Sequence, residues 1–383
     1  MSPDAARTEA PDLPLSVLDL VPVSEGSTAT QAVRNAIDLA RHAERLGYRR
    51  YWLAEHHLNE GVAGSSPPVL AALLASATER IRVGSAGVQL GHRTPLSAVE
   101  EFGLVDALHP GRLDLGLGRS GKQLIRERAS APEHRPAAHH NGGVLIPRPP
   151  DLGSLRRSAR LAVTFALLQQ PGAEAPDYGD QVDDLLALLD GTYRSAEGVA
   201  AHAVPGEGAD VEVWVLGSSG GQSARVAGSR GLRFAANYHV SPATVLDAVE
   251  GYRAAFRPSA HLSRPYVAVS ADVVVADTDD HARHLAAGYG LWVLGIRRGE
   301  GAIPFPAPEQ AAAHTWTAED RALVADRVDT QIVGSPATVV AQLRRLRQAT
   351  GADELAVTTI THDPADRLRS YELLAIEWRT STD

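Results

Sequence analysis

The sequence of 383 residues contains no cysteine, and its single methionine is the first residue. Disulfides, thiolate zinc sites and cysteine nucleophiles are therefore excluded. No apolar run approaches the ~20 residues that a membrane-spanning helix needs. The net charge of −9 argues against a partner that presents a phosphate backbone. We therefore expect a globular protein that binds neither nucleic acid nor a membrane.

The N-terminal stretch, residues 1–13, is polar and rich in proline and alanine. It lacks the apolar core of a signal peptide, so we expect a flexible tail and a cytoplasmic location. The whole chain is 44% hydrophobic and 22% charged, which is typical of globular proteins. We expect one domain over residues 14–376 and a C-terminal tail over residues 377–383.

Apolar runs of strand length alternate with helical patterns. Strands are expected at residues 15–23, 51–57, 81–88, 112–118, 211–217, 234–238, 266–276 and 354–361. Helices are expected at residues 31–46, 67–78, 95–108, 180–189, 242–256 and 334–347, and a short one within 154–170. This order favours a closed (β/α)8 TIM barrel over a doubly wound sheet, although the pattern alone allows both.

An insertion after the fourth expected strand interrupts the alternation. It covers about residues 122–176 and is rich in histidine, proline and glycine in its first part. Segments of this length without regular structure are usually functional loops or disordered. We therefore expect a lid here.

Polar or small residues follow six of the expected strands. In a (β/α)8 barrel the working groups sit at the carboxyl ends of the strands. The residues at these ends are 55–57, 85–87, 118–120, 218–220, 237–239, and Thr359 with Thr361. Their common phase predicts one shared site at this end of the barrel.

The second expected strand ends in Glu55, His56 and His57. Histidine is suited to proton transfer because its pKa lies near neutrality. An ordinary polar strand end at the surface is the alternative. A metal site is not expected here, because adjacent histidines on a strand point to opposite faces.

A Gly/Ser loop, residues 217–223, lies between the fifth expected strand and a helix. Its backbone N–H groups, hydroxyls and helix dipole could bind a phosphate, with Arg119 as charge partner. The loop lacks the lysine of a P-loop, so nucleoside triphosphate hydrolysis is not indicated. A plain flexible turn is the alternative. The small residues of 83–88 could admit a flat ligand or serve tight helix–strand packing.

Four motifs resemble those of the bacterial luciferase-like flavin monooxygenases. They are YWLAEHH at 51–57, RVGSAGV at 82–88, LHPGRLDLGLGR at 108–119 and VLGSSGGQSA at 215–224. The similarity covers roughly residues 14–122 and 177–375 in order. It implies a (β/α)8 barrel, usually dimeric, that binds reduced FMN (FMNH2) supplied by a separate NAD(P)H:flavin reductase. Reduced FMN reacts with O2 to give a C4a-hydroperoxide, which oxygenates a small organic substrate.

The resemblance also implies roles for individual residues. His56 corresponds to a catalytic acid–base, with Glu55 orienting its neighbours and His57 facing the barrel wall. A non-proline cis peptide is implied between Ala86 and Gly87. The flavin-binding positions are Ala86, Gly87, Arg119, Ser218, Ser219, Gly220, Ser223, Asn237 and Tyr238.

The chain departs from the family at residues 120–122, Ser-Gly-Lys, where relatives commonly have a Pro-Gly-Thr-type turn. The substrate is therefore the part of the resemblance that transfers least. A deazaflavin-dependent dehydrogenase on the same barrel is the alternative enzyme. A non-catalytic flavin-binding protein is the alternative outside enzymes.

Overall fold

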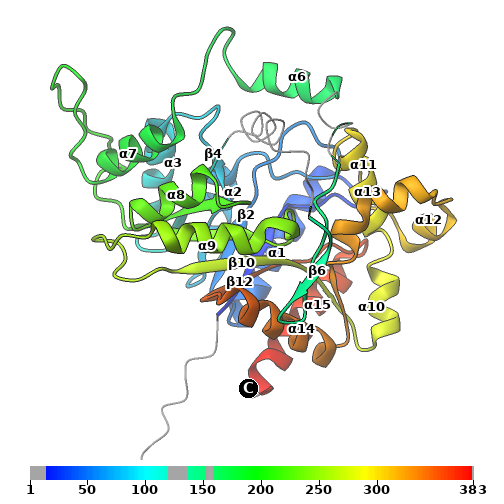
Figure 1. Ribbon diagram of the computed structural model, residues 1–383. Helices are drawn as coiled ribbons and strands as arrows, with labels where there is room; N and C mark the ends of the chain where they lie inside the picture. The colour runs from blue at the N-terminus through cyan, green and yellow to red at the C-terminus, as the bar shows by residue number, and fades with distance from the viewer. Residues whose placement is uncertain (1–13, 120–135, 152, 154–157, 382–383) are drawn as a thin grey trace, which may run out of the picture.

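The computed structural model describes residues 14–119, 136–151, 153 and 158–381 (Figure 1). Within these residues, eight parallel strands form a closed ring, because β12 pairs with β1 and β9 pairs with β10. In ring order they are β1 (Leu15–Asp19), β2 (Arg50–Leu53), β3 (Arg82–Ser85), β5 (Leu113–Gly118), β8 (Val211–Gly217), β9 (Arg233–Asn237), β10 (Val267–Val275) and β12 (Glu354–Thr358). The expected (β/α)8 barrel is confirmed, and the doubly wound sheet is excluded.

Helices surround the ring. They include α1 (Ala29–Arg45), α2 (Pro67–Ala77), α3 (Pro95–Asp106), α7 (Tyr178–Leu189), α8 (Gln222–Ser229), α9 (Val245–Ala255), α10 (Asp279–Leu285), α14 (Pro336–Thr350) and α15 (Pro364–Thr380). Local sequence sets their starts. The Thr28 hydroxyl accepts the Gln31 N–H at 3.1 Å before α1, and proline occupies the first turn of α2, α3, α14 and α15. A short 3-10 turn (Pro242–Thr244) leads into α9.

Several elements differ from the sequence-based expectation. Short strands β4 (Val88–Gln89) and β11 (Ile332–Gly334) were not expected, nor were helices α11 (Tyr289–Arg298), α12 (Pro308–Ala313) and α13 (Ala318–Val328). Helix α11 has buried apolar residues around much of its circumference, so it lacks the one-sided pattern that reveals a surface helix. The C-terminal tail was expected to begin at residue 377, and this boundary is wrong because α15 continues to Thr380. The expected N-terminal tail lies outside the described residues.

The insertion after β5 has regular elements of its own. Strands β6 (His139–Asn141) and β7 (Val144–Ile146) form an antiparallel hairpin that packs against α14. Helix α6 (Ala159–Leu168) falls inside the helix expected at 154–170 and lies across the top of the molecule in Figure 1. The expected lid also includes residues 122–135, 152 and 154–157, which lie outside the described part of the chain.

Buried ion pairs fill the barrel at the amino-terminal ends of its strands. The fully buried Arg50 donates to Asp114 at 2.9 Å, to Glu354 at 2.9 Å and to Glu212 at 2.8 Å. Next to this cluster, the rings of Trp52 and Trp214 meet edge to face with centroids 4.8 Å apart. Because this end is packed, a cavity inside the barrel is left for the carboxyl ends of the strands.

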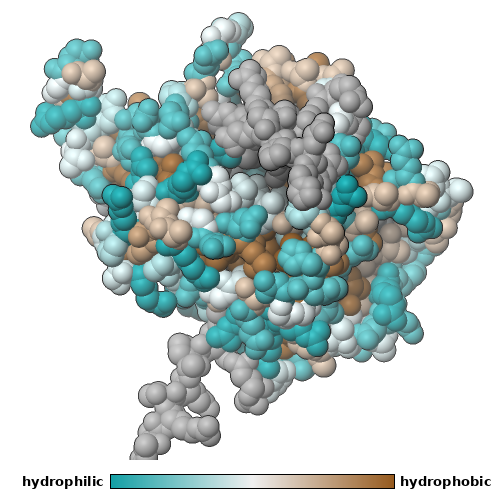
Figure 2. Space-filling model, in the orientation of Figure 1, coloured by the Kyte–Doolittle hydropathy of each residue, from teal (hydrophilic) through white to brown (hydrophobic). Residues whose placement is uncertain are grey.

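The face of the molecule seen in Figure 2 is mostly hydrophilic, with hydrophobic residues showing in patches between the polar ones. No helix among the described residues combines the length and apolar character needed to cross a membrane. The large apolar side chains gather instead between the barrel and its surrounding helices.

Candidate active site

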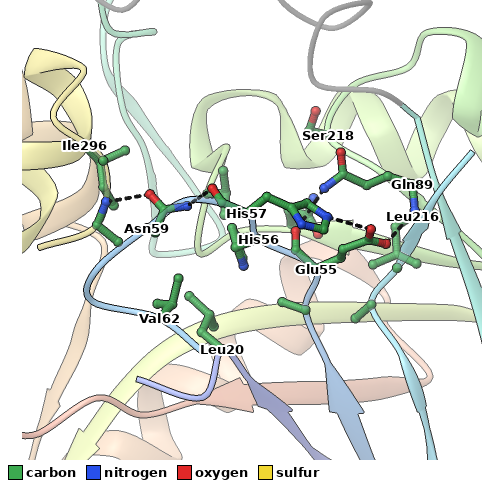
Figure 3. Close-up of a pocket in the computed structure, with 18 of the residues that line it drawn as sticks. Leu20, Glu55, His56, His57, Asn59, Val62, Gln89, Leu216, Ser218 and Ile296 are labelled. Carbon is green, nitrogen blue, oxygen red and sulfur yellow. Dashed lines mark hydrogen bonds and ion pairs between the residues drawn. The ribbon is translucent and has the colours of Figure 1, made fainter. Parts of the chain in front are cut away.

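A cavity of about 500 Å³ opens at the carboxyl ends of the barrel strands. Eight of the residues predicted from the sequence line it: Glu55, His56, Ala86, Gly87, Arg119, Ser218, Ser223 and Asn237. They come from β9, from α8 and from the segments that follow β2, β3, β5 and β8. The common phase of the strand ends therefore identified one cavity, as Figure 3 shows for part of its lining.

Three other predicted flavin contacts do not line this cavity. The Ser219 hydroxyl accepts the Gly221 N–H at 3.3 Å, within its own loop. Gly220 packs against α9, where a Cβ atom would meet the Asp247 carbonyl oxygen at 2.8 Å. The buried Tyr238 donates its hydroxyl to the Leu145 carbonyl at 2.8 Å and so ties β9 to the β6–β7 hairpin. These three positions make structural contacts, and their contact with a flavin stays a prediction.

Glu55 is the centre of a buried hydrogen-bond cluster. Its Oε1 accepts from Nε2 of His57 and Nε2 of His92, each at 2.8 Å, and its Oε2 accepts the Gln89 N–H at 2.9 Å. Burial opposes the charge of this carboxylate, but the hydrogen bonds from His57, His92 and Gln89 outweigh it and lower the pKa of Glu55 to about 2. Glu55 is therefore ionised at neutral pH and orients two imidazoles, neither of which is His56.

His56 lines the cavity with little polar support. Its backbone N–H donates to the Gly64 carbonyl at 2.7 Å, which fixes the main chain, while its Nδ1 is buried and has no hydrogen-bond partner among the described residues. Burial, with a smaller contribution from the neighbouring His57, lowers the pKa of His56 to about 4. The imidazole is therefore neutral at pH 7 and can exchange a hydrogen bond or proton with a bound molecule.

His57 also lines the cavity, so the expectation that it faces only the barrel wall is wrong. The chain has left β2 at Leu53, and the strict alternation of a strand no longer applies at His56 and His57. Figure 3 shows the His57 ring turned toward Glu55. The ring also meets that of His92 edge to face, with centroids 5.2 Å apart.

The ligand atoms of Glu55, His57 and His92 lie within 4.8 Å of one another, a grouping that could hold a metal ion. Sequence reasoning had considered a metal site of His56 and His57 with Glu55, and not His92. Both imidazoles, however, already hydrogen-bond the same Oε1, and Arg93 Nε lies 3.5 Å from that oxygen. A guanidinium at this distance opposes a second cation, so hydrogen bonding accounts for the cluster better than a metal does.

The cavity wall at the end of β3 is made of small residues. The peptide between Ala86 and Gly87 is cis, which confirms the expectation from the resemblance. Gly84 and Gly116 serve a different purpose, because a Cβ atom at either would lie 2.0 Å from a carbonyl oxygen of the neighbouring strand. The small residues of this stretch therefore serve strand–strand packing at Gly84 and a flat cavity wall at Ala86 and Gly87.

Arg119 and the Gly/Ser loop form one end of the cavity. Arg119 Nη1 donates to Gln222 Oε1 at 3.2 Å, and Gln222 Nε2 donates to Asp177 Oδ2 at 2.8 Å. Ser218 and the buried Ser223 line the same end, where α8 begins. A guanidinium, two hydroxyls and a helix N-terminus thus converge at one place, which is the chemistry of an anion site.

A second buried ion pair lies at the cavity wall near His56. Arg327 Nη2 lies 3.3 Å from Asp272 Oδ2 and 2.8 Å from the Tyr289 hydroxyl, which also donates to Asp272. Burial lowers the pKa of His239 well below its ordinary value, helped by Arg327 and His56. Sequence reasoning placed His239 at a strand end but gave it no role. It missed Arg327 altogether, because α13 was not expected.

The remaining wall is largely apolar. Helix α6 contributes Leu161, Phe165 and Leu168, and α11 contributes Trp292 and Ile296. Both helices lie outside the barrel repeat, so the strand-end rule could not point to them. An apolar wall of this kind strengthens electrostatic interactions wherever a bound molecule displaces water from it.

The closed barrel, with converging polar groups at the carboxyl ends of its strands, defines an enzyme of the (β/α)8 class. The sequence pattern of the luciferase-like monooxygenases matches residues 13–140 and 171–354. A luciferase-like monooxygenase of Escherichia coli K12 is 34% identical over 358 residues, covering 94% of this chain and 95% of that protein. The chain therefore belongs to the luciferase-like monooxygenase family and is an oxygenase.

Two further relatives align over nearly their full length. The uncharacterised protein YvbT of Bacillus subtilis is 38% identical over 377 residues, covering 98% of this chain and 99% of that protein. The crystal structure of apo-MsnO8 has a TM-score of 0.76 at 31% identity and covers 97% of this chain and 99% of its own.

Three other similar proteins are named for an activity or a cofactor. An N-acetyl-S-alkylcysteine monooxygenase of B. subtilis is 44% identical over 124 residues, covering 32% of this chain and 37% of that protein. A diketocamphane monooxygenase solved with FMN shares the fold, with a TM-score of 0.60 at 21% identity. An F420-dependent secondary alcohol dehydrogenase also shares it, with a TM-score of 0.59 at 13% identity.

Proposed function

We propose that the enzyme is an FMNH2- and O2-dependent monooxygenase that oxygenates a small organic substrate, with reduced flavin delivered by a separate NAD(P)H:flavin reductase. One arrangement carries the proposal. An anion site at Arg119, a flat wall at Ala86 and Gly87 and a neutral histidine, His56, follow one another within a single cavity. The family membership and the FMN complex of a monooxygenase with the same fold support it.

The lining fits a flavin mononucleotide. Arg119, Ser218 and Ser223 would hold the phosphate, with the first turn of α8 adding its positive dipole end. Ala86 and Gly87 line the cavity and would lie against the flat ring system. The missing Cβ of Gly87 serves packing against β5, because a Cβ atom there would lie 2.7 Å from the Gly116 carbonyl oxygen. Reduced flavin, when bound, supplies the electrons that activate dioxygen.

His56 would then accept or donate one proton in a site shielded from bulk water. Its pKa of about 4 keeps the ring neutral, and its buried Nδ1 can accept a hydrogen bond from a bound molecule. The Glu55 carboxylate fixes the His57 ring through a hydrogen bond. Of the two neighbouring imidazoles, His57 is therefore engaged by Glu55, and His56 is left for a bound molecule. The apolar side chains of α6 and α11 keep bulk water from competing for the proton.

A deazaflavin-dependent dehydrogenase is the second candidate, favoured by one observation. An F420-dependent dehydrogenase and an F420-dependent reductase share the fold, with TM-scores of 0.59 and 0.58. A dehydrogenase would transfer hydride and leave no oxygen atom in its product. The higher similarity to the luciferase-like monooxygenases makes this the weaker candidate.

Anaerobic titration with reduced FMN and with reduced F420 separates the two candidates. We expect reduced FMN to bind and reduced F420 not to bind, and the variant Arg119→Gln to lose most of the FMN affinity. Thioethers and ketones should then be supplied with labelled dioxygen and a flavin reductase. One labelled oxygen atom in a product would support the monooxygenase, whereas F420 binding without label incorporation would support the dehydrogenase.

We also propose a cytoplasmic homodimer. Helices α2 and α3 contact each other and expose Val69, Leu73, Leu96 and Leu104 at 59%, 45%, 44% and 61%, respectively. A contiguous set of exposed apolar side chains on two adjacent helices is typical of a subunit interface. Static light scattering on the purified protein measures the oligomeric state, and a monomer at micromolar concentration would contradict the proposal.

A further inference from the structure

Arg119, Arg160 and Arg327 are the arginines that line the cavity among the described residues. Arg327 is paired with Asp272, and Arg119 lies at the Gly/Ser loop. Arg160, in the first turn of α6, makes no ion pair with a carboxylate of the described residues. Its hydrogen bonds there go to one amide oxygen, Asn59 Oδ1, from Nη1 at 3.4 Å and from Nη2 at 3.3 Å.

These two hydrogen bonds are long and therefore weak. Asn59 is already fixed by better ones, since its Oδ1 accepts the Ala302 N–H at 3.0 Å and its Nδ2 donates to the His57 carbonyl at 2.9 Å. The chain also keeps space for the guanidinium, because a Cβ atom on Gly301 would lie 1.9 Å from Arg160 Nη1. Arg160 therefore lies in the cavity wall, and its guanidinium has no carboxylate partner among the described residues.

Apart from Asn59 and Thr164, the cavity wall around Arg160 is largely apolar. Leu161 follows it in α6, Phe165 and Leu168 lie one and two turns further along, and Ile296 of α11 completes this part of the wall. A cation beside apolar surface is costly unless an anion accompanies it. The anion that fits is a planar carboxylate, which can take two parallel hydrogen bonds from one guanidinium.

Arg160 also lies at the correct end of the cavity. In Figure 3, Asn59, its hydrogen-bond partner, lies at the opposite side of His56 and His57 from Ser218 of the Gly/Ser loop. A flavin with its phosphate at Ser218 and Arg119 would leave the Asn59 side to the substrate. This step rests on the proposed function.

We propose that Arg160 binds the carboxylate of the substrate, and that the substrate is an otherwise apolar organic acid. The apolar body would lie along α6 and α11, and the atom to be oxygenated would lie on the His56 side. Arg160 is then a specificity-determining residue contributed by the insertion.

The test compares phenylalkanoic acids of increasing chain length with their primary amides, which match them in shape but carry no charge. Binding to the oxidised FMN complex is measured by calorimetry, without turnover. We expect the best acid to bind about tenfold or more tightly than its amide, a usual effect of a charge-assisted hydrogen bond. In Arg160→Gln this preference should disappear, and in Arg160→Lys part of it should remain.

Arg298→Gln is the matched control. Arg298 lies on α11 outside the cavity lining and pairs with Asp320 at 2.6 Å, so its loss changes the net charge equally but should keep the acid preference. Equal binding of acid and amide by the wild type, no binding of any acid, or an unchanged preference in Arg160→Gln would overturn the proposal. FMN affinity of the same variants is measured separately, so failure of the flavin site is recognised as a failure of the proposed function.

Discussion

Replacing Glu55 by glutamine removes the charge from a carboxylate whose side chain is fully buried. The residue would keep its size and one acceptor oxygen, but His57, His92 and the Gln89 N–H would lose their ionised partner. The folded pKa of about 2 lies below the ordinary value of 4.5. At ~1.4 kcal/mol for each pH unit, ionised Glu55 contributes roughly 3 kcal/mol to folding.

The sign of the pH dependence follows from the lowered pKa. The contribution is present in full above pH 4.5 and is lost as the pH falls toward 2, because the unfolded chain takes up the proton first. We therefore expect Glu55→Gln to lower the free energy of unfolding by roughly 3 kcal/mol at pH 7. The gap between wild type and variant should narrow by about 1 kcal/mol at pH 4 and by about 2 kcal/mol at pH 3.

Urea denaturation followed by tryptophan fluorescence and circular dichroism measures these differences. Glu101→Gln is the control, because Glu101 pairs with Arg93 at 2.9 Å in a partly exposed ion pair and should cost about 1 kcal/mol or less. A Glu55→Gln effect no larger than that of the control, or a gap that stays constant from pH 7 to pH 3, would refute the reasoning.

Three other changes test different parts of the molecule. His56→Ala should reduce kcat at least tenfold and leave FMN affinity within about threefold, since a positioned proton-transfer group contributes more to the reaction than to binding. Stopped-flow turnover measures kcat and flavin titration measures the affinity. An unchanged kcat would disprove proton transfer by His56. Arg50→Met should lower the free energy of unfolding by about 3–5 kcal/mol, because it leaves Glu354 buried without its cation and Asp114 with Arg82 alone. A loss below about 1 kcal/mol in chemical denaturation would contradict this. Leu73→Glu should convert the proposed dimer to monomers in light scattering with little loss of stability, because this side chain is already exposed. A variant that is dimeric would contradict an interface at Leu73.

Glu55, His56 and His57 are consecutive in the sequence, but the structure holds their side chains in two different ways. Glu55 and His57 are held by hydrogen bonds, whereas His56 is held by packing and by its main chain. A residue that must gain and lose a proton benefits from the second arrangement, because no strong partner fixes its charge state. We therefore propose His56 as the imidazole that transfers the proton, with Glu55 and His57 as positioning residues.

The sequence by itself determined the alternation of strands and helices and the end of the sheet that carries the site, and it favoured a closed barrel without excluding a doubly wound sheet. Both depend on local patterns, namely apolar periodicity and the residue type at each strand end, and these survive without knowledge of any long-range contact. The Gly/Ser loop, Arg119 and the Glu-His-His stretch were found in this way, and the structure brings Arg119, Ser218 and His56 to one cavity.

Only the tertiary structure decided which side chains meet. His92 reaches Glu55 from the segment after β4, Tyr238 turns away from the cavity toward the hairpin, and Arg160 enters from a helix outside the barrel repeat. Such contacts depend on side-chain direction and on how distant segments pack, and neither has a periodic signal in the sequence. The resemblance to a family could locate the end of the cavity at which we propose that flavin binds. The opposite end is built from the insertion and from α11, and packing alone placed them there.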